Sequence, residues 1–306
     1  MGFFHSAFRN ALPFFFYKYL YIIWPEQKRQ REEEERLRPE REREARLLAL
    51  TAPNAQYRDL HRGKRCFILC NGPSVKQQDI AALAGELVFS VSNGYHHPDY
   101  AKIAPAFHCV PQITYGMLTR ADVIAWFREM HEKTGTATIF LNHTEEPLVR
   151  EEGLFPGRNV RYVYLAGSFS NRPTDAIPDI SREIPGAQSV PIMCLMIAMY
   201  MGFKQIHLLG TDHDHFRSGE YKYFYEPTVL RGKDLTADVD GKLRGGWHDE
   251  LAGLAALWNQ YRAIRRIAEA NGVAVVNSTA GGELDEFPRI PLEAALAGKP
   301  SADTVN

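Results

Sequence analysis

The sequence lacks a long apolar run, an excess of charge of either sign and a large number of cysteines. Its 306 residues include 36 lysines and arginines against 37 aspartates and glutamates, a net charge of −1 at pH 7. A balanced charge provides no basic field that attracts nucleic acid, so we expect no nucleic-acid partner. The hydrophobic content of 45% and the charged content of 24% are typical of a soluble globular protein with a buried core.

Cysteine is scarce: the chain has Cys66, Cys70, Cys109 and Cys194, all in apolar surroundings. The spacing of Cys66 and Cys70 does not match a zinc knuckle, and it places both thiols on one face of a strand. We therefore expect buried, unpaired thiols in a reducing cytoplasm.

The apolar stretch at 13–24 reads Pro-Phe-Phe-Phe-Tyr-Lys-Tyr-Leu-Tyr-Ile-Ile-Trp. It is shorter than the roughly 20 residues that span a bilayer, and it has no small-residue cleavage site of a secretory signal. Tyrosine, tryptophan and one lysine are typical of the membrane–water interface. We expect residues 1–25 to hold a cytoplasmic protein on the inner face of the cytoplasmic membrane. Packing on the globular domain or on a second subunit of a homo-oligomer is the alternative.

Charged residues fill most of the next segment, 26–60. Opposite charges recur at helical spacing, as in Glu32 with Arg36, which predicts a solvated helix. Pro39 is expected to kink or restart it, and the missing apolar seam argues against a long coiled coil. We expect a spacer helix before a catalytic domain at 62–290 and a tail at 291–306.

From about residue 62, short apolar runs alternate with amphipathic stretches and no internal repeat occurs. This predicts an α/β, Rossmann-like, mainly parallel sheet with helices on both faces. The expected strands are 65–70, 87–92, 106–110, 137–141, 160–164, 205–210 and 273–277, and the expected helices are 76–84, 120–133, 190–202 and 248–271, with a short helix after Arg289. Residues 142–187 and 212–247 are expected to be long loops, of the kind that form lids.

The most informative motif, Asn71-Gly72-Pro73-Ser74, ends the first apolar run. A small-residue turn between a strand and a helix directs backbone N–H groups and the positive helix end at phosphates. The glycine permits close approach, the proline sets the turn and the serine is a good N-cap. Taken alone, the motif is equally compatible with an ordinary tight turn.

Three further polar clusters occur at predicted strand ends or helix starts. They are Ser92-Asn93-Gly94-Tyr95, Gln188-Ser189-Val190-Pro191 and Gly210-Thr211-Asp212-His213-Asp214-His215. Parallel strands bring such clusters to one edge of the sheet, where the phosphates, ribose and base of a nucleotide bind. The carboxylates and imidazoles at 212–215 also suit a divalent ion, but in an extended segment they point to opposite sides. We expect hydrogen bonding there, with Asp212 as a donor-site carboxylate and no metal.

Asn-Gly-Pro-Ser after one strand and Ser-Asn-Gly after the next resemble the bacterial sialyltransferases of glycosyltransferase family 42. The unit Met-Cys-Leu-Met-Ile-Ala-Met-Tyr-Met-Gly-Phe-Lys-Gln-Ile-His-Leu-Leu-Gly-Thr-Asp-His at 193–213 is similar to that family and to the MptE-like (6-hydroxymethylpterin diphosphokinase-like) proteins. The resemblance covers residues 64–280. It implies a metal-independent glycosyltransferase with a CMP-activated acidic sugar as donor, either sialic acid or a related nonulosonic acid or Kdo, and a surface glycan or glycolipid as acceptor.

The resemblance also implies residue roles. His248, in Gly-Gly-Trp-His-Asp-Glu, would be the base that takes the acceptor's proton, and Tyr221 and Tyr223 would stabilise the departing phosphate. An imidazole suits the first role because it titrates near neutral pH, although His248 also suits the start of the helix that follows. With the strand-end clusters, the expected nucleotide-binding residues are Asn71, Gly72, Pro73, Ser74, Asn93, Gly94, Ser189, Gly210 and Thr211.

The chain departs from the family pattern at several positions. Ser189-Val190-Pro191 stands in place of Thr-Ser-Gly, Val110 stands where an asparagine is expected, and the tyrosine doublet is offset. The donor sugar therefore stays open. One alternative is an MptE-like diphosphokinase that moves pyrophosphate from ATP to a pterin alcohol, with Asp212 and Asp214 as Mg²⁺ ligands. The other is a non-catalytic nucleotide- or glycan-binding subunit that uses the charged helix as a docking arm.

Overall fold

The computed structural model describes residues 18–19, 23–113, 118–171, 175–218, 222–225 and 246–298. Contacts divide the chain into two compact units, Met1–Ala49 and Leu50–Asn306. Most of helix α3 belongs to the first unit, and the whole sheet belongs to the second.

Helix α3 (Trp24–Thr51) has the charged surface expected from its sequence. Ion pairs one turn apart join Lys28 to Glu32 at 3.8 Å and Arg38 to Glu42 at 3.6 Å. The helix is one continuous element that includes Pro39, so the expected restart does not occur: good helix formers on both sides offset the lost hydrogen bond. The segment 13–24, which was expected to lie at a membrane interface, is mostly outside the described residues. In the described ranges no helix combines the length and apolar composition of a bilayer crossing.

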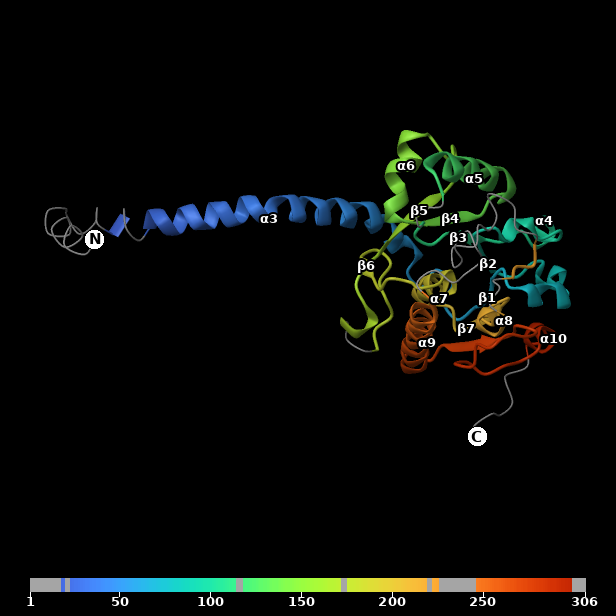
Figure 1. Cartoon of the computed structure of the whole chain (residues 1–306). Helices are drawn as coiled ribbons and strands as arrows, with labels where there is room; N and C mark the ends of the chain where they lie inside the picture. Colours follow the sequence, from blue (N-terminus) through green and yellow to red (C-terminus); the bar gives the residue numbers. More distant parts are fainter. Residues whose placement is uncertain are drawn as a thin grey trace, which may run out of the picture. The chain divides into compact units, whose positions relative to one another are not determined.

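The second unit contains an eight-stranded sheet whose neighbouring strands are all parallel, in the order β6-β5-β4-β3-β2-β1-β7-β8 (Figure 1). This topology confirms the predicted Rossmann-like α/β fold, and all seven predicted strands are present. The strands are β1 (Arg65–Leu69), β2 (Val88–Val91), β3 (Phe107–Cys109), β4 (Thr138–Asn142), β5 (Val160–Leu165), β6 (Glu183–Ile184), β7 (Gln205–Leu209) and β8 (Ala274–Asn277).

The strand order reverses beside β1. Strands β2 to β6 extend the sheet to one side of β1, whereas β7 and β8 add to the other side, and the last residues Leu69 and Leu209 are paired. In open parallel sheets, ligands bind in the crevice where the order reverses, beyond the carboxyl ends of the strands. The topology therefore selects the ends of β1 and β7 as the place to look for a site.

Side chains of β1 alternate between two cores, as the two-residue period of a strand requires. Cys66 and Ile68 belong to one core, whereas Phe67 and Leu69 belong to the other. Because both sets are fully buried, the strand reads as a continuous apolar run in the sequence.

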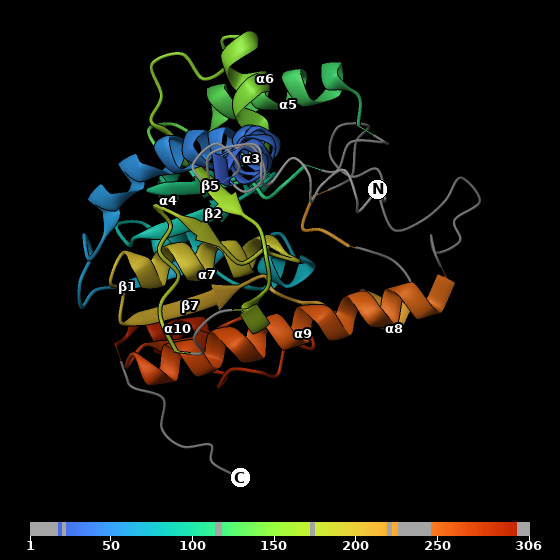
Figure 2. The ribbon, with the colours of Figure 1, turned by 90° about the vertical axis from the view of Figure 1, so that its left-hand side faces the viewer.

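Helices α7 (Val190–Tyr200) and α9 (Gly246–Ala270) pack on the face of the sheet that carries Cys66 (Figure 2). Helix α7 is buried on all sides, which explains why its sequence is apolar throughout. Its observed range and that of α9 confirm the two predicted helices. Cys66 and Cys70 face this same core, all four cysteines are free and buried, and burial raises the pKa of the Cys66 thiol well above its usual range.

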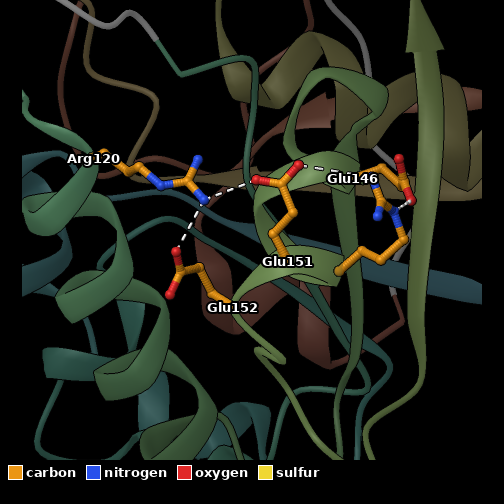
Figure 3. A network of polar contacts seen from close by, with 5 residues as sticks. Arg120, Glu146, Glu151 and Glu152 are labelled. Atoms are coloured by element: carbon orange, nitrogen blue, oxygen red, sulfur yellow. Dashed lines mark hydrogen bonds and ion pairs between the residues drawn. The ribbon is translucent and has the colours of Figure 1, made fainter.

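The opposite face is covered by helix α5 (Arg120–Lys133), which was predicted, and by helix α6 (Glu146–Glu151), which was not. Arg120 joins them through hydrogen bonds to Glu151 and Glu152, both at 2.9 Å (Figure 3). These side chains are exposed, so the pairs contribute little to stability. Helix α6 and strand β6 correct the expectation that 142–187 forms long loops outside the predicted strand 160–164. Six and two residues are too few to show a period.

The segment after β1 also differs from expectation. Instead of a helix at 76–84, the chain forms two 3-10 turns, η3 (Pro73–Gln77) and η4 (Ile80–Leu83). The buried Val75 and Ile80 are five residues apart, a spacing that does not bring two side chains to the same side of an α-helix. Consequently no α-helix begins at the end of β1, and the predicted alignment of a helix dipole with a phosphate does not apply there.

The folded body begins before residue 62. The 3-10 turn η2 (Ala52–Tyr57) lies against the sheet, where the Asn54 side chain donates hydrogen bonds to the carbonyl oxygens of Tyr162 at 2.7 Å and Ile180 at 2.9 Å. At the other end of the chain, helix α10 (Leu292–Leu296) confirms the short helix expected after Arg289.

Candidate active site

The turn that follows β1 is attached to the residue that follows β7. The backbone N–H of Ser74 donates to Oδ1 of Asp212 at 3.1 Å, and the Ser74 hydroxyl donates to Oδ2 at 2.7 Å. Both side chains are buried. Burial raises the pKa of Asp212, and the two hydrogen bonds from Ser74 partly offset this effect. Asp212 therefore holds the β1 turn in place, and both of its carboxylate oxygens are engaged.

Gly72 and Gly210 make this attachment sterically feasible. A Cβ at Gly72 would lie 1.9 Å from Oδ2 of Asp212, and one at Gly210, where φ is +65°, would lie 2.6 Å from the carbonyl oxygen of Cys70. The N–H of Gly72 donates to the carbonyl oxygen of Gly210 at 2.9 Å. The expected close approach at Gly72 is thus observed, but the group that approaches is a carboxylate of the same chain.

Asn71, just after β1, presents a buried hydrogen-bond acceptor at the switch point, the place where the strand order reverses. Its Nδ2 donates to the carbonyl oxygen of Val91 at 3.2 Å, which orients the amide because nitrogen must face that carbonyl. Oδ1 of Asn71 is buried and receives no hydrogen bond from the part of the chain that the structure describes. Gly94 leaves space beside this atom, since a Cβ there would lie 3.4 Å from it. A ligand hydroxyl or amine would satisfy Oδ1.

Asn93, after the neighbouring strand β2, is the centre of a second polar cluster. Its Oδ1 accepts hydrogen bonds from the indole N–H of Trp126 at 2.7 Å and from the hydroxyl of Tyr95 at 3.3 Å. Its Nδ2 donates to the hydroxyl of Tyr225 at 3.3 Å, and the Tyr95 hydroxyl also reaches Glu129 at 3.4 Å. Asn93 therefore fixes aromatic groups around the edge of the sheet.

Of the loop expected at 212–247, residues 212–218, 222–225 and 246–247 are described, and residues 222–225 lie on these strand ends. The N–H of Phe224 donates to the carbonyl oxygen of Asn71 at 3.1 Å. The rings of Tyr223 and Tyr225 stack with centroids 5.1 Å apart and an interplanar angle of 7°. Tyr223 is thus beside the site, whereas Tyr221 lies outside the described residues.

Asp212 and the two histidines at 212–215 have different hydrogen-bond partners. Asp212 faces Ser74, whereas Nε2 of His213 lies 2.7 Å from the hydroxyl of Tyr261 and Nε2 of His215 lies 2.6 Å from Oε1 of Glu250. Asp212 is thus separated from the two imidazoles, as expected, although His213 has a φ of +47° and the segment is therefore not extended. Burial lowers the pKa of His213 to about 4, so its ring is neutral.

The described acidic and imidazole side chains at 212–215 are not gathered at one point. Across the described ranges, no group of three or more His, Cys, Asp or Glu side chains is arranged to hold an ion. Asp212, the carboxylate that the diphosphokinase alternative needs as a Mg²⁺ ligand, uses both oxygens on Ser74.

Other predicted nucleotide-binding residues have local roles. Pro73 is the first residue of η3, and Ser189 precedes α7 without a side-chain cap bond. The buried Thr211 hydroxyl lies 2.9 Å from that of Thr279. Within the described ranges, no hydrogen bond joins Ser189 to Asn71 or Ser74.

His248 lies in the first turn of α9. Among the described residues, no hydrogen bond joins its side chain to Asn71, Ser74 or Asn93. Its side chain is 92% exposed, and its Nδ1 lies 2.9 Å from Oδ1 of Asp249. Because a carboxylate only accepts, Nδ1 carries the proton of this hydrogen bond. Nε2 is thereby the nitrogen available as a base. Figure 2 shows that α9 begins on the side toward which the arrow of β7 points.

The sequence did not identify Trp126, Tyr225 or Asn142 as site residues. Trp126 lies within an amphipathic helix and Tyr225 within a loop, and neither position carries a motif. Asn142 ends β4 at the same edge, where its Nδ2 donates to the Thr144 hydroxyl at 2.8 Å. An asparagine at a strand end was the signal that could have found it. Val110, at the end of β3, is buried and apolar.

No protein-family model matches the chain, and no curated protein matches it either. Solved structures that are similar to it include the following two. One is a MAf glycosyltransferase from Magnetospirillum magneticum AMB-1, with 17% identity and a TM-score of 0.46 over 79% of this chain. The chain spans 38% of that protein's length. The other is the sialyltransferase CstII from Campylobacter jejuni in complex with the substrate analogue cytidine-5'-monophosphate, with 13% identity and a TM-score of 0.42 over 75% of this chain and 85% of that one.

Proposed function

We propose that this protein is a glycosyltransferase that uses a CMP-activated acidic sugar, sialic acid or a related nonulosonic acid or Kdo, to extend a surface glycan. The observation that carries the proposal is the buried Oδ1 of Asn71, which has no donor among the described residues and lies at the switch point of a parallel sheet. Asn93 and the turn held by Asp212 flank it. The motif that resembles the bacterial sialyltransferases supplies these same residues.

The donor site would bind its nucleotide by hydrogen bonds and stacking. Asn71 offers an acceptor for a ribose hydroxyl or a base amine, and the stacked rings of Tyr223 and Tyr225 offer phenolic hydroxyls to the leaving phosphate. Phenols and backbone amides can stabilise that phosphate without formal positive charge. No metal enters this scheme.

The base in this proposal is His248. Its Nδ1 is oriented by Asp249, so that Nε2 can remove the proton of the acceptor hydroxyl as that oxygen attacks the anomeric carbon of the donor. The bond between that carbon and the CMP phosphate oxygen breaks, and CMP leaves with the bonding electrons. In this proposal the donor binds at the strand ends and the acceptor binds beside α9. The two substrates together would then extend from Asn71 to His248.

The test compares Asn71→Ala with Asn159→Ala, a matched change at an exposed asparagine before the amino end of β5. Calorimetry measures the Kd of CMP, and CMP release from CMP-sialic acid and CMP-Kdo measures turnover. Loss of one hydrogen bond should raise the Kd of CMP about fivefold in Asn71→Ala and leave it unchanged in Asn159→Ala. Equal CMP affinities in the two variants would contradict the donor site.

The base is tested by His248→Ala, which should abolish transfer while CMP still binds. Full turnover in this variant would place the base elsewhere. A thermal shift with ATP and Mg²⁺ but none with CMP would favour the diphosphokinase. Binding of CMP with no turnover of either donor would favour a non-catalytic subunit.

A further inference from the structure

A hollow of about 370 Å³ lies beside the first half of α9, and its described lining does not include Asn71, Ser74 or Asn93. Its volume falls in the range of small-molecule sites, which is about 300–1,000 Å³. The walls come from helix α8 (His215–Ser218), from α9 and from the loop before α10. The lining residues are Phe216, Leu251, Leu254, Ala255, Trp258, Glu283 and Asp285.

The hollow combines an aromatic and aliphatic floor with carboxylates. Trp258 is held in place because its indole N–H donates to Oδ1 of Asp285 at 2.8 Å. Glu283 is paired with Arg217 at 2.8 Å. Among the described residues that line the hollow, none is a lysine or an arginine. An apolar wall beside hydrogen-bond acceptors suits a pyranose ring, whose C–H face packs on an aromatic side chain while its hydroxyls donate to carboxylates. The negative side chains disfavour an anionic sugar.

The hollow is physically connected to the donor edge. The N–H of Glu283 donates to the carbonyl oxygen of Asp212 at 2.7 Å, and Asp212 holds the Ser74 turn. On the other wall, Leu251 follows His248 by less than one helical turn along α9. The hollow therefore has a wall attached to the predicted donor site and another next to the predicted base.

We propose that this hollow binds the acceptor, and that the acceptor ends in a neutral sugar. The inference rests on the proposed glycosyltransferase function and adds to it the place and the chemical class of the second substrate. Trp258 would contact the apolar face of the ring, and Asp285 and Glu283 would accept hydrogen bonds from its hydroxyls.

The test places a larger side chain in the hollow and leaves Trp258, Glu283 and Asp285 unchanged. Ala255 lines the hollow and is exposed, and its neighbour Ala256 is also exposed but is not among the lining residues. Ala255→Phe and Ala256→Phe are therefore matched variants. The probes are methyl β-galactoside, methyl β-glucoside and methyl β-glucuronide, observed by saturation-transfer difference NMR on the full chain with CMP present.

We expect signals from at least one of the two neutral glycosides with the wild type and with Ala256→Phe. Ala255→Phe should weaken that binding about tenfold or more, since it removes most of the contact surface. Asp285→Asn should weaken it less, because the amide keeps an acceptor oxygen. The glucuronide should bind more weakly than the neutral sugars.

Three results would overturn the inference. In the first, neither neutral glycoside binds the wild type, or each binds equally well to both phenylalanine variants. In the second, octyl β-glucoside binds and methyl β-glucoside does not, which would assign the hollow to an aliphatic chain. In the third, Ala255→Phe changes the oligomeric state in sedimentation while sugar binding is absent, which would assign the surface to a second copy. CMP release from the donor without acceptor tests the proposed function separately: if the wild type cleaves CMP-sugars but binds no glycoside, only this inference fails.

Discussion

The Ser74 hydroxyl donates to the Asp212 carboxylate at 2.7 Å, across 138 residues of sequence. This hydrogen bond and the parallel one from the Ser74 backbone join the ends of β1 and β7, the two strands between which the sheet order reverses. A carboxylate buried at this point determines the shape of the turn on which the proposed donor site is built.

Ser74→Ala removes the hydroxyl from a hydrogen bond to a buried carboxylate. We expect the free energy of unfolding to fall by about 1.5–3 kcal/mol, the usual range for hydrogen bonds to charged groups. Urea denaturation followed by circular dichroism measures the change. Ser168→Ala is the control, because the exposed Ser168 hydroxyl contacts only the nearby Ser170. Equal effects of the two substitutions would show that the Ser74 hydroxyl does not stabilise the fold.

Asp212 should also affect the pH dependence of stability. Its pKa is raised above the usual 3.8 by burial, so between 3.8 and the raised value the folded state binds more protons than the unfolded state. The contribution of this group to the free energy of unfolding therefore decreases as the pH rises through that window. Asp212→Asn removes the titration. The stability of the wild type relative to Asp212→Asn should fall from pH 4 to neutral pH in urea titrations, and a constant difference would contradict the buried carboxylate.

Tyr225→Phe tests the attachment of residues 222–225 to Asn93. The substitution removes the acceptor of the Asn93 Nδ2 hydrogen bond, which is 3.3 Å long. The Phe224 amide, which donates to Asn71, should exchange with deuterium about fivefold faster, as expected for the loss of about 1 kcal/mol. Tyr162→Phe, in the middle of β5, should leave that rate unchanged. If exchange at Phe224 is the same in both variants, the hydrogen bond does not hold the segment.

His108 should contribute to acid unfolding. Its ring is buried in contact with the Ser90 hydroxyl at 2.7 Å, and burial lowers its pKa from 6.5 to about 3. Between these values the unfolded state binds more protons, so stability is lost as the pH falls through the window.

His108→Asn keeps a polar atom near Ser90 and removes the titration, so the loss of stability between pH 6.5 and pH 3 should be smaller than in the wild type. His248→Asn, at an exposed histidine, is the control for the general effect of replacing a histidine with asparagine. An unchanged pH dependence in His108→Asn would contradict the lowered pKa.

Much of the fold could be predicted because the information was local. The strands β1 and β7 are apolar runs bounded by polar turns, and α7 is an uninterrupted apolar helix after a proline. Both patterns come directly from elements buried on both sides. The prediction was wrong where local spacing was ambiguous, as at η3, or where an element was short, as at α6.

The candidate site could be predicted less completely. The sequence placed Asn71, Asn93 and Asp212 at one edge of the sheet, because parallel strands must end together. It assigned Asp212 to the donor, whereas the structure engages both carboxylate oxygens with Ser74. A side chain's partner depends on packing between distant segments, and a strand-end motif does not contain that information.

The amino-acid sequence by itself determined the α/β class, the parallel sheet and the edge at which the polar residues gather, because these follow from hydrophobic periodicity and from chain direction. Only the tertiary structure decided that Trp126 and Tyr225 hold Asn93, that Asp212 holds Ser74 and that a hollow opens beside Trp258. The physical reason is that these contacts join segments separated by 33, 132 and 138 residues and, at the hollow, three separate elements. Their geometry is set by how the helices and loops pack on the sheet.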